Sequence, residues 1–156
     1  MIHSKIIEFG EALPILSHPE IFNRIKDDLA DLGDLSPSEN ELFVGTFDGE
    51  KLIGVWWLES LTSTALDIHA QILPQYRKHK HSSWQQCLEI IINELPSAHK
   101  VQAKIPTCFP SIYQFAKDNG MVDEGLERES KLINGQHYDQ WCVGATVKEM
   151  VGHGQG

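Results

Sequence analysis

The feature that most constrains the fold is a strand, a short basic turn and an amphipathic helix within residues 66–95. Polar and apolar residues alternate over residues 66–73, which is the period of a strand, and Pro74 ends it because proline cannot donate to a ladder. The turn at residues 75–81 carries three fixed positive charges. Ser82 or Ser83 is predicted to cap the helix, with Gln85 or Gln86 completing a capping box. Its apolar residues lie on one helical face: Trp84, Leu88, Ile91, Ile92 and Leu95. Exposed amides and cations between a strand and a helix form a natural anion-binding turn.

The composition is that of one globular domain. The chain has 156 residues, 41% hydrophobic and 22% charged, which suffices to bury a core. Acidic side chains outnumber basic ones 22 to 13, which argues against nucleic-acid and anionic-membrane partners. Apolar runs are too short to span a bilayer, the start lacks a signal-peptide layout, and three cysteines without a CxxC pair predict no disulfide framework. We therefore expect a cytoplasmic protein with a single domain at residues 1–147 and a flexible tail at residues 148–156.

The rest of the chain predicts a mixed sheet. Residues 5–9 form a first strand, and a helix begins at the cap Ser17 and buries apolar residues from Ile21 to Leu32. Hairpins are predicted around Asp48-Gly49 and Asn134-Gly135, because such turns need positive φ. Residues 101–105 form a strand, and a helix runs from Pro110 to Asn119-Gly120. This order predicts an α/β sheet with antiparallel ends and one parallel pair, residues 66–73 beside 101–105. We expect a ligand where that pair parts.

Taken in order, these segments resemble the GNAT superfamily of acyl-CoA-dependent N-acyltransferases. The resemblance rests on the hairpin at residues 42–54, on Ile72-Leu73-Pro74-Gln75-Tyr76-Arg77, on residues 111–121 and on the Asn134-Gly135 hairpin. It implies a GNAT-like mixed central sheet flanked by helices, acetyl-CoA as the acyl donor, and main-chain groups of Ile72 and Leu73 that hold the pantetheine. The chain is also distantly similar to small phage-encoded GNAT-like proteins, some of them head-assembly proteins.

Two departures from the family pattern bear on activity. Lys80 and Ser82 stand where the family usually has the glycines of a loop whose amides hold the CoA pyrophosphate. Glycine permits close backbone approach, which lysine replaces only by charge. Ala116 stands where the family often has a general-acid tyrosine, and Tyr113 lies one helical turn earlier.

Each candidate residue has an alternative interpretation. Arg77, Lys78, Lys80 and Ser82 are the predicted CoA contacts, because a diphosphate attracts cations and amides; the alternative is a solvated basic turn. Asp67 and His69 share the polar face of their strand with Gln71, and either would accept a proton from an amine. The alternative is that this face meets solvent, or pairs with Trp57 and Glu59. No metal site is predicted, because His79 and His81 lack a carboxylate or cysteine at useful spacing.

Two function classes remain open. The first is an acetyl-CoA-dependent N-acetyltransferase whose acceptor is a primary amine on a small molecule or a protein. The second is a GNAT fold without activity, kept as a binding or assembly protein with a protein partner or as a homo-oligomer. That protein would work in a virion or in a host cytoplasm if it were phage-encoded.

Overall fold

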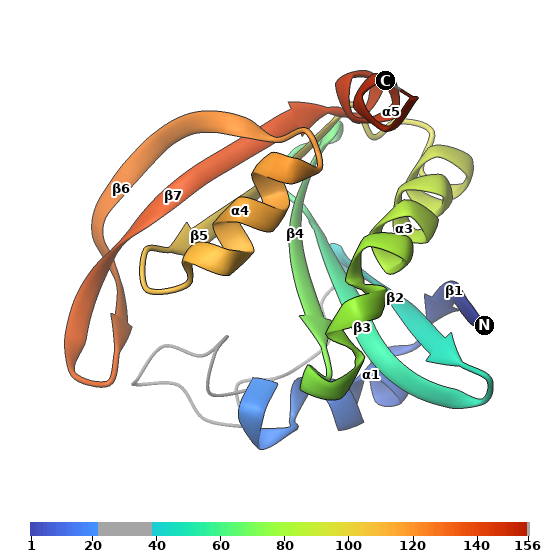
Figure 1. Ribbon diagram of the computed structural model, residues 1–156. Coiled ribbons are helices and arrows are strands. Elements are labelled where there is room, and N and C mark those ends of the chain that lie inside the picture. The colour runs from blue at the N-terminus through green and yellow to red at the C-terminus, as the bar shows by residue number, and fades with distance from the viewer. Residues whose placement is uncertain (22–38, 156) are drawn as a thin grey trace.

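A computed structural model describes residues 1–21 and 39–155. The helix predicted from Ser17 to Leu32 therefore lies mostly outside the described residues, although Ile21 at its start is buried. The described chain folds around one sheet with helices on both faces (Figure 1).

The sheet has seven strands in the order β1-β2-β3-β4-β5-β7-β6. They are β1 (Ile2–Ile7), β2 (Glu41–Asp48), β3 (Lys51–Ser60), β4 (Ala65–Ile72), β5 (Lys100–Pro106), β6 (Val122–Ile133) and β7 (Gln136–Thr146). Neighbouring strands are antiparallel except for β4 and β5, which are parallel. The predicted mixed sheet is confirmed, including the parallel pair and the internal position of β3.

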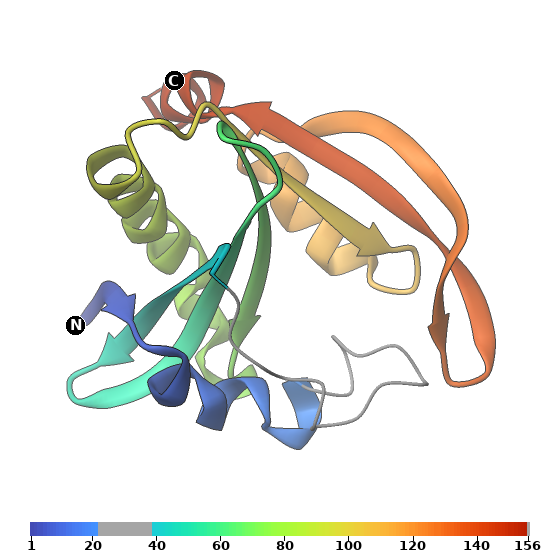
Figure 2. The same cartoon turned by 180° about the vertical axis from the view of Figure 1, so that it is seen from behind.

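The parallel pair is short, and this creates the main opening in the sheet. Ala65, Leu66 and Asp67 are in register with Lys100, Val101 and Gln102, and the pairing ends there. Figures 1 and 2 show β4 and β5 meeting near α5 and then separating along their length. A gap between parallel strands leaves backbone groups and side chains of both edges available to a ligand.

The two predicted hairpins are confirmed, but one turn is shifted by a residue. Asn134 and Gly135 have φ of 51° and 77° and form the two-residue turn between β6 and β7, as a type I′ turn requires. In the first hairpin Asp48 pairs with Lys51, so the turn residues are Gly49 and Glu50. Of these only Gly49 has positive φ, 63°, which is the pattern of a type II′ turn.

Helices α3 (Lys80–Glu94), α4 (Pro110–Asp118) and α5 (Val147–Gln155) pack on one face of the sheet, and α1 (Phe9–Leu16) packs on the other (Figure 2). Strand β1 ends at Ile7, and α1 replaces the strand expected at residues 5–9. Reciprocal hydrogen bonds between Glu8 and Glu11 cap α1, and it buries Ala12, Ile15 and Leu16.

Residues 147–155 form α5 where a flexible tail was expected. Thr146 and Glu149 make a capping box: the Thr146 amide donates to Glu149 Oε1 at 3.0 Å, and the Glu149 amide donates to Thr146 Oγ1 at 3.1 Å. Met150 is 2% exposed and joins the core between α3 and α4. Capping and one buried anchor thus fold this segment onto the domain.

Helix α3 begins earlier than predicted. Pro74–His79 forms a 3₁₀ helix, η2, that continues directly into α3 at Lys80. No side chain caps α3, so the predicted caps at Ser82 and Ser83 are wrong. Ile92 also lies outside the predicted apolar face, since it is 42% exposed.

Ser83 instead belongs to a buried chain of hydrogen bonds beneath α3. Trp56 Nε1 donates to Ser83 Oγ at 2.7 Å, Ser83 Oγ lies 2.6 Å from Thr46 Oγ1, and Thr46 Oγ1 lies 2.8 Å from Ser4 Oγ. Ser4 then donates to Gln86 Oε1, and Gln86 Nε2 donates to the Ile2 carbonyl. Each hydroxyl has one hydrogen to donate, so the chain runs in one direction and fixes α3 on β1, β2 and β3.

Candidate functional site

A cavity of about 250 Å³ lies where β4 and β5 separate. Its walls come from five elements around the gap. They include Asp67, Ile68, His69, Ala70 and Gln71 of β4, Ala103, Lys104 and Ile105 of β5, Lys80 and Trp84 of α3, Ile112, Phe115 and Ala116 of α4, and Met150 of α5. The ligand site expected at the parting of the parallel pair therefore coincides with a cavity.

The two sides of the cavity differ in polarity because β4 side chains alternate between faces. Ile68 and Ala70 face α3 and α4 and belong to the main apolar core. Asp67, His69 and Gln71 alternate with them and lie on the face that α1 covers, where His69 packs against Trp57. One side therefore suits an apolar group and the other a polar one.

Asp67 and His69 form a pair on the polar side. His69 Nε2 donates to Asp67 Oδ2 at 3.1 Å, with the side chains 36% and 15% exposed respectively. Trp57 is directly across the ladder from His69, and its ring centroid lies 5.6 Å from the imidazole. Because an ionised carboxylate only accepts, it holds the imidazole proton on Nε2 and leaves Nδ1 as an acceptor.

Glu59 joins this pair, and the sequence pattern gave it only as an alternative neighbour. It lies opposite Asp67 in the β3–β4 ladder, and ligand atoms of Glu59, Asp67 and His69 lie within 4.8 Å of one another. Opposite Glu59 in turn lies Glu41 of β2. Three carboxylates on three neighbouring strands thus share the acceptor-facing side, a pattern that only strand register could reveal.

The β4 main chain also faces the gap. The Leu73 amide donates to Ile53 O at 2.9 Å, and its carbonyl accepts from the Tyr76 amide. Since main-chain groups alternate sides along an antiparallel strand, those of Ile72 and Ala70 point away from β3 and toward the gap. Of the two predicted pantetheine contacts, Ile72 thus has main-chain groups on the gap side, while those of Leu73 bond within the protein.

The basic turn keeps its cations but not an open row of amides. Tyr76 donates to Leu73 O and Lys80 to Arg77 O, the i→i+3 pattern of the 3₁₀ helix. Arg77, Lys78 and Ser82 are exposed, whereas Lys80 lies 4.5 Å over the Phe115 ring and lines the cavity. The predicted contacts therefore divide into an exposed group at the turn and Lys80 at the cavity wall. The gap and the cations fit an acyl-CoA thioester and its phosphates, with charge in place of amides.

No tyrosine reaches the cavity from α4. Ala116 lines it and is 9% exposed. Tyr113 stacks on Trp141 and donates to Asp123 Oδ1 at 2.6 Å, and this hydrogen bond raises the pKa of the Tyr113 hydroxyl. Tyr113 therefore points toward β6 and is not placed to protonate a leaving group.

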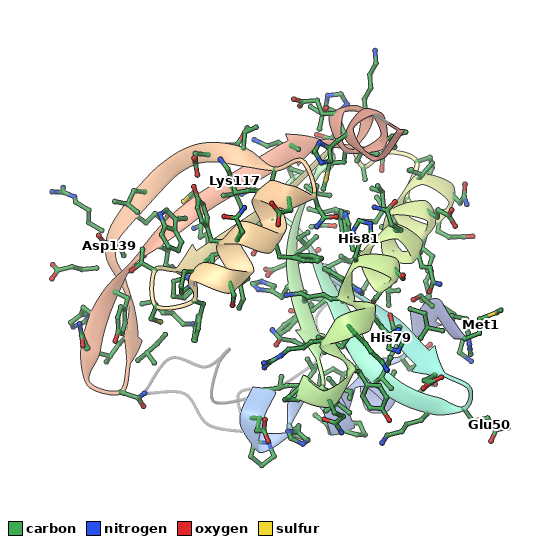
Figure 3. All side chains as sticks on the ribbon, viewed as in Figure 1. Met1, Glu50, His79, His81, Lys117 and Asp139 are labelled. Atoms are coloured by element: carbon green, nitrogen blue, oxygen red, sulfur yellow. The ribbon has the colours of Figure 1, made fainter. Side chains whose placement is uncertain are left out.

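The remaining sequence candidates have other partners. His79 stacks on Tyr76 and His81 bonds Asn119 Oδ1 at 3.0 Å, so the two imidazoles, labelled in Figure 3, do not converge. Burial raises the pKa of the Cys108 thiol, which disfavours the thiolate that a nucleophile needs.

Comparisons with known proteins identify the fold. No protein-family model matches the sequence, and a search of curated proteins found no match. The structure is similar to spermidine N-acetyltransferase from Vibrio cholerae in complex with CoA and spermine, with a TM-score of 0.81, 16% identity, and coverage of 96% of this chain and 98% of that one. Mutant forms of that enzyme give 0.79 at 17% identity over 98% of both chains. Its complex with manganese ions gives 0.75 at 15% identity, over 97% of this chain and 96% of that one.

These similarities show that the chain has the GNAT fold, as the sequence resemblance implied. They give no support to the similarity with phage head-assembly proteins. In the part of the chain that the structure describes, no helix is long and apolar enough to cross a membrane.

Proposed function

We propose that this protein is an acyl-CoA-dependent N-acyltransferase that acts on a primary amine. The observation that carries the proposal is the Asp67–His69 pair on the polar side of a cavity located where β4 and β5 part. Acyl-CoA supplies the acyl group as a thioester. Ile72 and Ala70 main-chain groups would hold the pantetheine, and Arg77, Lys78 and Lys80 would attract the phosphates.

In this proposal His69 is the proton acceptor and Asp67 its positioning partner. As the amine nitrogen bonds to the acyl carbon and the carbon–sulfur bond breaks, the amine proton passes to His69 Nδ1, directly or through a water. The thiolate takes a proton from solvent, since Ala116 offers no acid. A reference thiol pKa of about 8.5 makes this leaving group tolerable. A missing positioned acid costs about 10²–10⁴-fold in rate, so slow turnover is expected.

The carboxylates support a cationic acceptor. Glu41, Glu59 and Asp67 are each partly buried, and they lie side by side on neighbouring strands. The polyamine of the Vibrio cholerae complex is one such amine, with several positive charges along a chain. We therefore place polyamines first among the acceptors to test, ahead of neutral amines.

The test is acceptor-dependent release of CoA thiol from acetyl-CoA across polyamines, amino acids and lysine peptides. Asp67→Asn and His69→Ala should abolish release while the melting temperature and the binding of acetyl-CoA are kept. Release that persists in both variants would show that another group accepts the proton.

A second candidate is a binding or assembly protein that has the GNAT fold without its activity. The closed 3₁₀ turn at Pro74–His79 and Ala116 in the cavity wall favour it. Calorimetric titration with acetyl-CoA and CoA separates the two classes without knowledge of the acceptor. Absence of binding at millimolar ligand would favour the second.

A further inference from the structure

The cavity lies deeper in the gap than the residues expected to hold CoA. On β4 it is lined by Asp67 through Gln71 and not by Ile72 or Leu73. From the basic turn and the start of α3 only Lys80 reaches it, while Arg77, Lys78 and Ser82 do not. A thioester that enters along β4 past Ile72 would thus have the cavity ahead of its sulfur, on the side where the acyl group lies.

The inner end of this cavity is apolar. Side chains from both strands, three helices and the start of β6 converge there: Ile68, Ala103, Trp84, Ile112, Phe115, Ala116, Met121 and Met150. Met121 and Met150 are 4% and 2% exposed and close the end. Polar side chains that line the cavity on the other β4 face, among them Asp67 and His69, are where a reacting carbonyl would sit.

Ala116 contributes to the free space. A larger side chain at this position of α4 would project into the cavity, because Ala116 is both buried and part of its wall. An apolar cavity of about 150 Å³ is enough to hold a benzene ring, and this one measures about 250 Å³. An acetyl group alone would leave most of it empty, and an unfilled apolar cavity forfeits contacts with its walls.

We propose that the cavity is an acyl-chain pocket and that the preferred donor carries an acyl chain of about six carbons, by comparison with the benzene that a smaller cavity holds. The inference rests on the proposed function, because it names the donor class of the same reaction. Each methylene buried on transfer from water contributes about fourfold in affinity. Affinity should therefore rise with chain length and level off once the pocket is filled.

The experiment is a calorimetric titration of the protein with CoA, acetyl-CoA, butyryl-CoA, hexanoyl-CoA and decanoyl-CoA. We expect hexanoyl-CoA to bind at least tenfold more tightly than acetyl-CoA, with no further gain for decanoyl-CoA. Ala116→Leu should remove the gain, and Met150→Ala should move the preferred length upward. Ala98→Leu, which adds the same volume at a partly buried site outside the cavity, is the matched control. Melting temperatures confirm that each variant folds.

The outcomes separate this inference from the proposed function. Equal affinity for all donors, or a gain that survives Ala116→Leu, overturns the pocket and leaves the acyltransferase proposal standing. Failure of every acyl-CoA to bind overturns the acyltransferase proposal. In that event the hexanoyl thioester of N-acetylcysteamine, which lacks the nucleotide, tests the cavity alone: binding that Ala116→Leu abolishes upholds an acyl pocket, and no binding removes it.

Discussion

Replacing Ser83 by alanine should destabilise the protein much more than the same change at its neighbour Ser82. Ser83 is 2% exposed and accepts the indole hydrogen bond of Trp56, itself 5% exposed. Without the hydroxyl, the indole N–H is buried with no acceptor, which costs about 1–3 kcal/mol. Ser82 is exposed and caps nothing, so Ser82→Ala should change the free energy of unfolding by no more than about 0.5 kcal/mol.

Urea unfolding followed by tryptophan fluorescence and by far-UV circular dichroism measures both variants. A double-mutant cycle with Trp56→Phe isolates the indole bond. In that background the cost of Ser83→Ala should fall to that of the bond with Thr46, about 0.5–1.5 kcal/mol. Equal losses for Ser82→Ala and Ser83→Ala would refute the buried chain and favour a serine cap at the helix start, as the sequence suggested.

Three further predictions concern the turns, the new helix and the basic turn. Gly135→Ala should cost about 1–2 kcal/mol of stability, because its φ of 77° disfavours a side chain, whereas Gly152→Ala should stabilise α5 by about 0.5–1 kcal/mol, since it is helical, exposed and has open space around it. Equal effects of the two changes in thermal unfolding would contradict the turn or the helix. The amide and hydroxyl of Thr146 lower the pKa of Glu149, so the α5 capping box should stabilise the protein above the unfolded pKa of this carboxyl and cease to do so as pH falls through the folded value. A Glu149→Gln variant should be less pH-sensitive over that acidic range, and identical pH profiles would count against the box. Arg77→Ala with Lys80→Ala should weaken CoA binding about tenfold or more, at roughly 1.5–3 kcal/mol for each charge-assisted bond, and an unchanged dissociation constant at low salt would exclude these cations from the site.

The sequence predicted the parts of the fold that depend on local patterns. Asn134-Gly135 determines its turn because both residues take positive φ. The apolar run within β3 implied burial on both faces, and β3 does lie inside the sheet. The parallel pairing of β4 with β5 followed from a strand, a helix and a strand in order, since such a crossover leaves the two strands parallel.

Other features depended on signals that were present but not read, or on tertiary packing. Thr146 and Glu149 have the spacing of a capping box, so the sequence carried a signal for α5. Ser83 could not be assigned from sequence, because a serine near a helix start is as consistent with a cap as with a buried partner for Trp56. The row of Glu41, Glu59 and Asp67 depends on the register of three strands, which no single segment specifies.

The turn between β4 and α3 shows how one local conformation changes the chemistry of a site. In the 3₁₀ helix, amides such as those of Tyr76 and Lys80 bond to carbonyls three residues earlier, so a phosphate that approaches this turn meets cations rather than a row of free donors. Attraction between exposed charges is screened over about 8 Å at physiological salt, while hydrogen bonds to amides are less sensitive to salt. Any anion affinity at this turn should therefore depend steeply on ionic strength. The apolar cavity beyond Lys80 is insensitive to salt, so in this protein the acyl end of a donor, rather than its phosphates, is better placed to determine affinity under physiological conditions.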